Sequence, residues 1–225
     1  MVKMQVKADL HIHTTYSNDS IITPRDLVFY AKKRGLTAVA VTDHNKVEGA
    51  LKIAKETDFL IIPGTEVSSR DGHIIGLNVK EIIPRGLSAD ETVGRIHAVG
   101  GIAMACHPFV LFKGSLGKRV TANFDAIEVI NARAFPFNRS TKKAQEAATR
   151  LGLSRVAGTD AHYGPQIGYA YTLIDAEPNV EAIIKAITER RCEPVGEPVP
   201  LFLNLEQQYQ RWKRWKRKIS ETSVT

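Results

Sequence analysis

The chain has 225 residues, of which 43% are hydrophobic and 24% are charged. This length can bury a full-sized core, and α/β barrels of about 200 to 250 residues commonly form one domain. The two cysteines, Cys106 and Cys192, form neither a CxxC pair nor a closely spaced disulfide framework, and no apolar run approaches membrane-spanning length. These features exclude a disulfide scaffold and a transmembrane protein, and they predict a cytoplasmic protein.

The formal net charge of +7 is concentrated near the C-terminus. Six of the 31 basic residues lie within residues 211–218, whereas residues 1–210 hold 25 basic and 23 acidic residues. The charge pattern therefore predicts that any electrostatic partner is bound by the tail and not by the rest of the chain.

Short β-branched runs alternate with longer amphipathic segments, which indicates repeated βα units around a parallel sheet. Strands are expected at residues 6–12, 38–42, 59–63, 73–77, 102–106, 126–130, 155–158 and 169–174. Helices are expected at residues 24–35, 47–56, 88–99, 139–151 and 180–191. Thr23 and Asn179 are predicted N-caps, and Ser88 with Glu91 forms a predicted capping box.

The C-terminal segment differs in composition from the rest. Residues 1–195 are predicted to form the barrel domain, and residues 196–225 a proline-containing linker and a basic amphipathic tail. In the tail, Tyr209, Trp212, Trp215 and Ile219 describe a narrow apolar stripe on a basic helix. This stripe could pack against the barrel, or the tail could bind nucleic-acid phosphates while the indoles stack on bases. Attachment to a membrane surface is the least favoured interpretation, because the stripe is narrow.

Six of the seven histidines lie where predicted strands meet loops, and acidic residues accompany them. The seventh, His97, lies inside an amphipathic helix and is expected to pack or face solvent. An HxH pair such as His11 and His13 points both imidazoles to one face of a strand. Each signal is weak alone, but so many imidazoles and carboxylates at one end of a barrel would be costly unless cations bound them. Nitrogen and oxygen ligands without thiolates fit zinc, manganese or iron.

Five short motifs, taken together, resemble those of the polymerase-and-histidinol-phosphatase family over roughly the first 195 residues. They are, in order, Asp9-Leu10-His11-Ile12-His13 continuing to Asp19, then Thr42-Asp43-His44, Gly64-Thr65-Glu66 with residues 73–77, His107-Pro108, and Gly158-Thr159-Asp160-Ala161-His162. Their order and spacing agree with the family pattern.

The resemblance implies an α/β fold, a single distorted (β/α)7, TIM-like barrel, with two or three divalent metal ions at the C-terminal ends of the strands. It assigns His11, His13, Glu66 and Asp160 to a first metal. It assigns Glu66, His73 and His107 to a second, with Glu66 bridging, and Asp19, His44 and His162 to a third. Asp9 and Asp43 are expected to orient neighbouring histidines or the backbone.

The activity implied is hydrolysis of a phosphate ester by a metal-bridging hydroxide, with Glu66 and Asp160 at its centre and His44 as proton donor. Arg133, in an Asn-x-Arg element found in many members, is expected to grip a phosphate, and Arg139 and Lys118 are weaker candidates. Residues 110–123 are expected to form a flexible basic lid. The expected substrate is a nucleotide, a sugar phosphate or an oligonucleotide end.

A different class of function is an RNA-binding subunit of a ribonucleoprotein with little catalysis of its own. Barrel proteins related to this family serve as protein components of ribonuclease P, and those relatives have largely lost the metal ligands. All nine ligand positions are filled in this chain, which favours an enzyme.

Overall fold

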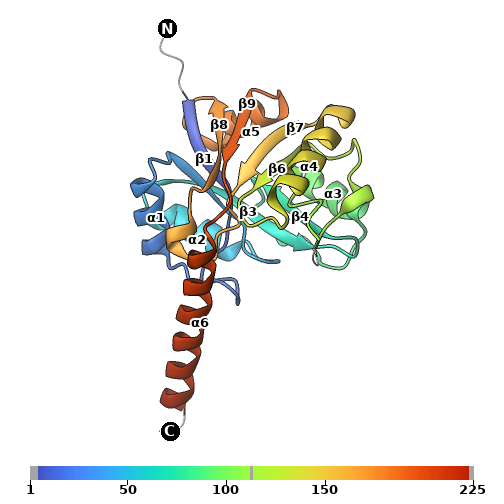
Figure 1. Cartoon of the computed structure of the whole chain (residues 1–225). Helices are drawn as coiled ribbons and strands as arrows, with labels where there is room; N and C mark the ends of the chain where they lie inside the picture. Colours follow the sequence, from blue (N-terminus) through green and yellow to red (C-terminus); the bar gives the residue numbers. More distant parts are fainter. Residues whose placement is uncertain (1–4, 112–113, 223–225) are drawn as a thin grey trace.

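The computed structural model describes residues 5–111 and 114–222, in which one strongly curved sheet forms a barrel (Figure 1). The strand order is β7-β6-β5-β4-β3-β2-β1-β8-β9. The strands are β1 (Gln5–Ile12), β2 (Ala38–Val41), β3 (Leu60–Ser68), β4 (His73–Leu77), β5 (Ile102–Ala105), β6 (Ala126–Asn131), β7 (Ser154–Gly158), β8 (Ala170–Asp175) and β9 (Cys192–Gly196). An isolated parallel bridge between Ile12 and Ala161 joins the end of β1 to the segment after β7, so the barrel is nearly closed.

The predicted TIM-like barrel is confirmed in outline, but strand number and direction differ from a (β/α)7 repeat. Nine strands are present among the described residues, and the pairs β3–β4, β4–β5, β1–β8 and β8–β9 are antiparallel. Only four residues separate β3 from β4, which is too few for the crossover that a parallel pair requires. The turn there contains Gly72 at φ +150°.

The strand β9 is missing from the sequence prediction, which assigned its end to a proline-rich stretch. It pairs antiparallel with β8 and is the last strand in the sheet order, so the absent N–H of Pro194 is tolerated there. Because β9 starts at Cys192, the preceding helix ends at Thr188 instead of continuing to residue 191.

Six α-helices lie within the described residues: α1 (Pro24–Lys33), α2 (Glu48–Glu56), α3 (Ala89–Ala98), α4 (Phe137–Leu151), α5 (Val180–Thr188) and α6 (Leu201–Thr222). The predicted N-caps are confirmed, whereas α4 begins at Phe137, two residues before its expected start. The Thr23 side chain accepts a hydrogen bond from the amide of Asp26, Ser88 and Glu91 form a capping box, and Asn179 caps α5. These side chains accept hydrogen bonds from amides of the first helical turn, which have no carbonyl partner within the helix.

The barrel interior is apolar and closed at the N-terminal end of the strands. Small and branched residues from β1 to β7, such as Ala8, Leu10 and Ile62, form one cluster with Ile183 and Ile187 of α5. Helix α5 therefore plugs the barrel opposite the C-terminal strand ends. The predicted metal ligands lie at the other end of the barrel.

The last helix, α6, extends away from the barrel (Figure 1). Leu203 and Gln207 in its first turns are 7% and 1% exposed, whereas Tyr209, Trp212 and Trp215 are 54%, 47% and 59% exposed. Of the alternatives left open for the tail, packing against the barrel therefore holds for the first turns of α6 but not for Tyr209, Trp212 and Trp215. None of the helices in residues 5–111 and 114–222 combines the length and hydropathy of a membrane span.

Candidate metal centre

The two histidines of the first motif are directed into the site by an irregularity in β1. The register of β1 against β2 shifts between Asp9 and Ile12, which changes the alternation of side chains along the strand. Leu10 belongs to the barrel interior, while the Nε2 atoms of His11 and His13 lie 3.1 Å apart at the mouth of the barrel. Gly158 of β7 permits this approach, because a Cβ there would lie 2.5 Å from the Cβ of His11.

Glu66 lies at the middle of the site, within β3 and not after it as the sequence suggested. Its Oε2 lies 3.2 Å from Nε2 of His11 and 3.0 Å from Nε2 of His13. Its other oxygen, Oε1, lies 2.7 Å from Nδ1 of His73 and 3.0 Å from Nε2 of His107. One carboxylate thus faces two separate sets of imidazoles.

A third set of donors surrounds Asp19 in the loop between β1 and α1. Its Oδ2 lies 3.1 Å from Nε2 of His162 and 3.4 Å from Nε2 of His44. The other oxygen of Asp19 is buried without a hydrogen-bond partner among the described residues. His44 also reaches the central carboxylate, since its Nδ1 lies 3.4 Å from Oε2 of Glu66.

Asp160 completes the first set from the segment after β7. Its Oδ1 lies 3.6 Å from Nε2 of His11 and 3.5 Å from Nε2 of His13. Asp160 and His107 both have positive φ, at +60° and +32°, in a region that residues other than glycine seldom adopt. Such conformations cluster where a site requires a particular side-chain direction.

The nine predicted ligands therefore converge, and their spacing suits divalent cations. Four groups of donor atoms, each within 4.8 Å of one another, are formed by His13, Asp19, His44 and His162; by His11, His13 and Asp160; by His11, Glu66 and His107; and by His44, Glu66 and His73. Tetrahedral ligands about 2.0 to 2.1 Å from a zinc ion would lie roughly 3.4 Å apart. The donor separations of 3.0 to 3.6 Å around His11 and His13 match that value.

The electrostatics of the centre favour positive charge. Burial opposes the charged form of His13, yet hydrogen bonds with Asp160 and Glu66 raise its pKa to about 9. Burial also opposes ionisation of Glu66, but the charge of His11 and several imidazole hydrogen bonds hold the pKa of that carboxyl well below its usual range. The carboxylates thus stay ionised in a buried site, where protonated imidazoles or bound cations balance their charge.

Cys106 lies beside the centre without adding a thiolate. Burial and the nearby charge of Glu66 raise the pKa of its thiol well above the ordinary value, and its Sγ lies 3.6 Å from Oε1 of Glu66. The sulfur belongs to none of the groups of neighbouring donor atoms among the described residues, so those groups offer only nitrogen and oxygen.

The sequence reasoning missed Glu128, a buried acid on β6 that supports two of the histidines. Its Oε1 lies 3.0 Å from Nδ1 of His11, and its Oε2 accepts a hydrogen bond of 2.7 Å from the amide of His107. A carboxylate behind a ligating imidazole fixes the tautomer and raises its basicity. The signal available in the sequence was a single acid inside the apolar run of residues 126–130.

Arg133 lies in the cavity over the centre. This cavity of about 300 Å³ is lined by Asp19, His44, Glu66, His73, His107, Val110, Asn131, Arg133, Ala134, Phe135, Asp160 and His162. The guanidinium donates a 3.0 Å hydrogen bond to the carbonyl of Asp160. Lys118 and Arg139, the weaker candidates, are exposed and do not line this cavity.

The segment predicted as a flexible lid is attached to the barrel at many points. Leu116 and Val120 are 2% and 7% exposed, and the amide of Gly117 donates a 2.8 Å hydrogen bond to the carbonyl of Pro108. A Cβ on Gly114 would lie 2.9 Å from Nδ1 of His73, so glycine permits the segment to cover that imidazole. Residues 112–113 lie outside the described residues.

Asp9 and Asp43 hold backbone around the ligands. Asp9 accepts hydrogen bonds from the amides of His11, Thr159 and Gly168, and burial raises its pKa to about 6. Asp43 accepts bonds from the amide and hydroxyl of Thr14, each of 2.7 Å. His97, outside the site, lies 2.7 Å from Asp125 on the surface.

The first turns of α6 are tied to the loop that carries His162. Oε1 of Gln166, which is fully buried, accepts a 3.1 Å hydrogen bond from the amide of His162. The Nε2 of Gln166 donates to Oδ1 of Asn204 and Oε1 of Gln207, both at 3.0 Å. The side-chain amide of Gln166 thus connects the first turns of α6 to His162, a ligand of the third set.

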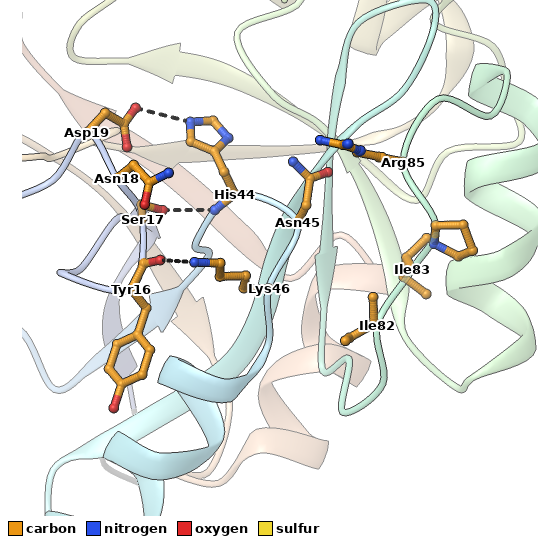
Figure 2. A pocket seen from close by; sticks show the side chains of 11 residues that line it. Tyr16, Ser17, Asn18, Asp19, His44, Asn45, Lys46, Ile82, Ile83 and Arg85 are labelled. Carbon is orange, nitrogen blue, oxygen red and sulfur yellow. Dashed lines mark hydrogen bonds and ion pairs between the residues drawn. The ribbon is translucent and has the colours of Figure 1, made fainter.

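A second cavity, of about 680 Å³, opens beside the first (Figure 2). It shares Asp19 and His44 with the metal centre and extends from them toward Lys46, Ile82 and Arg85. The two cavities therefore meet at the third set of ligands.

Comparisons with known proteins agree with this geometry. A family model described as the PHP domain matches residues 9–209. The uncharacterized protein MJ1587 of Methanocaldococcus jannaschii is 41% identical over 141 residues, which are 56% of this chain and 82% of that protein. A 5'-3' exoribonuclease of Haemophilus influenzae is 37% identical over 89 residues, 36% of this chain and only 32% of the enzyme.

Among solved structures, a two-domain protein of Bacteroides vulgatus containing a predicted PHP-like metal-dependent phosphoesterase superposes with a TM-score of 0.71 and 18% identity. The match covers 86% of this chain and 65% of that protein, and it supports the fold. Because the family model spans most of the chain, the protein belongs to the PHP domain family of metal-dependent phosphoesterases.

Proposed function

We propose that this protein hydrolyses phosphate esters of nucleotides, sugar phosphates or oligonucleotide ends with two or three divalent ions, manganese, zinc or iron. The observation that carries the proposal is the position of Glu66, whose two oxygens face separate sets of imidazoles at 2.7 to 3.2 Å. A carboxylate placed in this way would bridge two cations, and membership of the PHP domain family supports the reaction.

The proposed ligands follow the three sets of donor atoms. His11, His13, Glu66 and Asp160 would hold the first ion; Glu66, His73 and His107 would hold the second; Asp19, His44 and His162 would hold the third. The four groups of neighbouring donor atoms are drawn from these same nine residues. Bound divalent ions would supply Lewis acidity and lower the pKa of a water molecule to near neutrality. Glu128 holds His11 in the orientation that this binding requires.

Two side chains are proposed to act on the substrate. Arg133 offers guanidinium donors in the cavity over the ligands and would bind a phosphate through two parallel N–H···O hydrogen bonds. His44 lies between Asp19 and Glu66. In a chain loaded with two ions, where its imidazole would bind no metal, it would give a proton to the leaving alcohol oxygen. The complete ligand set argues against the alternative of a ribonuclease P-like RNA-binding subunit with little catalysis of its own.

The test is elemental analysis of the purified chain together with phosphate release from phosphomonoesters, nucleoside bisphosphates and short oligonucleotides. Two to three divalent ions per chain and manganese- or zinc-dependent turnover of one class are expected. A chain that binds no divalent ion and releases no phosphate from any of them would overturn the proposal.

Helix α6 favours nucleic acid as a partner of the same protein. Residues 196–225 would then serve as a basic arm on the catalytic barrel of residues 1–195. The rings of Trp212 and Tyr209 stack with their centroids 6.1 Å apart, and Nζ of Lys216 lies 4.1 Å from the ring centroid of Trp212. Cations and exposed aromatic rings therefore alternate along this helix. Single-stranded nucleic acids bind such surfaces through backbone charge and base stacking.

Replacing Lys213 and Lys216 by glutamine is expected to weaken binding of a generic single-stranded oligonucleotide. If both lysines contact phosphates, the slope of log affinity against log salt should fall by about 1.4, at about 0.7 per contact. The same double change at Lys142 and Lys143, two exposed lysines of α4, should leave the slope unaltered. An unchanged slope in the α6 variant would contradict phosphate binding by these lysines and would favour contact of α6 with another protein.

A further inference from the structure

Among the ligands of the proposed third ion, His162 lies in a segment without regular secondary structure. It falls between β7, which ends at Gly158, and the short 3₁₀ helix η2 (Gly164–Gln166). Its side chain is 8% exposed, and its Nε2 lies 3.1 Å from Oδ2 of Asp19. A buried ligand outside the sheet has no strand ladder to fix its backbone, so neighbouring groups must supply the hydrogen bonds.

Both backbone groups of His162 are hydrogen-bonded. Its carbonyl accepts a 3.0 Å bond from the amide of Ile21 and a 3.3 Å bond from the hydroxyl of Ser20, which follows Asp19 in the loop between β1 and α1. Its amide donates a 3.1 Å bond to Oε1 of Gln166. The loop that carries Asp19 therefore holds this ligand on one side, and Gln166 holds it on the other.

The orientation of the Gln166 side chain is determined by these bonds. Its Oε1 also accepts a 3.2 Å bond from the amide of Tyr163. Backbone N–H groups can only donate, so the oxygen must face the two amides and Nε2 must face α6. There Nε2 donates bonds of 3.0 Å to Oδ1 of Asn204 and Oε1 of Gln207. Gln166 is fully buried and Gln207 is 1% exposed, so little water can replace these partners.

The two acceptors on α6 lie on the side of the helix that packs against the barrel. Asn204 and Gln207 are one helical turn apart, on the same side as the buried Leu203. The hydroxyl of Tyr163 donates a further bond of 2.9 Å to Glu206, beside them on the helix. Both acceptor oxygens therefore reach the buried glutamine amide only when the first turns of α6 pack on the barrel.

The ligands of the first ion are held by other contacts. The amide of Asp160 donates a 2.8 Å bond to the carbonyl of His11, and the amide of His13 donates a 3.0 Å bond to the carbonyl of Ala161. Backbone bonds to β1 and the residues after it thus fix Asp160 without help from Gln166. A change at Gln166 is therefore expected to act on the third ligand set and not on the first.

We propose that Gln166 is a positioning residue for the third ion, and that the first turns of α6 are part of that ion's site. With α6 packed on the barrel, Gln166 holds His162 in the direction needed to ligate beside Asp19 and His44. Loss of the bonds to α6 lets the glutamine turn and weakens this ion alone, which converts a three-ion centre into a two-ion centre. The inference rests on the proposed function, because it takes these three ligands to hold an ion.

The test is calorimetric titration of the metal-free full chain with Mn²⁺ and, separately, with Zn²⁺, which counts the bound ions and measures each affinity. The unaltered chain is expected to bind three ions. Gln166→Met keeps the length of the side chain without its amide, and it should weaken the third ion by about 10- to 100-fold. The affinities of the first two ions should change by less than about threefold, because their ligands are held separately. Gln207→Met, which removes one acceptor on α6, should act in the same direction and carries the test if Gln166→Met does not fold.

Two further variants of α6 serve as controls. Gln208→Met makes the same change at the next, exposed position and should leave all three affinities unaltered. Gln207→Glu keeps an oxygen acceptor for Nε2 of Gln166 and should retain the affinity for the third ion within about threefold. A purely structural role of Gln166 predicts a lower melting temperature with all three ions weakened equally, or with none weakened. Either result would overturn the proposal.

Hydrogen exchange gives an independent readout, because coupling between two sites is reciprocal. Filling the third site should slow amide exchange in residues 203–208 of the unaltered chain but not of Gln166→Met. An unaltered chain that binds only two ions at every metal concentration would also overturn the inference, since there would be no third ion to position. A chain that binds three ions with the expected dependence on Gln166 but releases no phosphate would overturn the proposed hydrolysis alone.

Discussion

The substitution Glu66→Gln is expected to reduce kcat/KM for phosphate-ester hydrolysis by about a thousandfold or more, which corresponds to about 4 kcal/mol. The amide keeps the shape of the side chain but cannot ligate through both of its ends, so it cannot join the two sets of imidazoles that Glu66 now faces. Metal content should fall by at least one ion per chain. Steady-state kinetics and elemental analysis of the same preparation measure both effects.

Glu128→Gln is the matched control, because Glu128 is as buried as Glu66 but contacts the imidazole of His11 from behind. It should lower metal affinity by about 10- to 100-fold and recover most activity at saturating metal. Circular dichroism should show that both variants remain folded. Full activity of Glu66→Gln with verified metal content would remove this carboxylate from the proposed mechanism.

Removal of divalent ions with a chelator is expected to abolish phosphate release and to lower the melting temperature substantially. At a free metal concentration 1,000 times its Kd, one bound ion stabilises the folded state by about 4.1 kcal/mol. For a chain of this size that corresponds to roughly 8 to 16 °C. The reason is that Glu66 and Asp160 are ionised groups whose charges the cations balance. Differential scanning calorimetry with and without chelator measures the change.

Restoring manganese or zinc to the chelated chain should recover both melting temperature and turnover. In Glu66→Gln the metal-dependent part of the melting shift should be smaller, which separates binding at the centre from general salt effects. A melting temperature that does not respond to verified metal removal would show that the carboxylates are balanced by protons on histidines such as His13 alone.

The sequence indicated the candidate ligands because the chemistry of the centre depends on residue type at strand ends. The two-residue spacing of His11 and His13 predicted a shared strand face, and the capping residues Thr23 and Ser88 act through neighbours three positions away. Local patterns of this kind can be recognised without knowing the fold.

The features that could not be predicted depend on contacts between distant segments. Glu128 stood inside an apolar run, and its role becomes visible only when the nearly closed barrel brings it to His11 of β1 across Gly158 of β7. The register shift between Glu128 and Ile130 likewise has no local signature. The apolar stripe of α6 suggested packing, but exposure of Trp212 follows from the direction in which the helix leaves the barrel.

The attachment of α6 has a geometric consequence for whatever the helix contacts. Its 22 residues span about 33 Å, and the bonds from Gln166 reach only Asn204 and Gln207 near its base. Each residue removed beyond Arg214 would draw the helix end inward by about 1.5 Å and rotate the following side chains by about 100°. The length of α6 thus sets how far its C-terminal end lies from the barrel and in which direction its last side chains point.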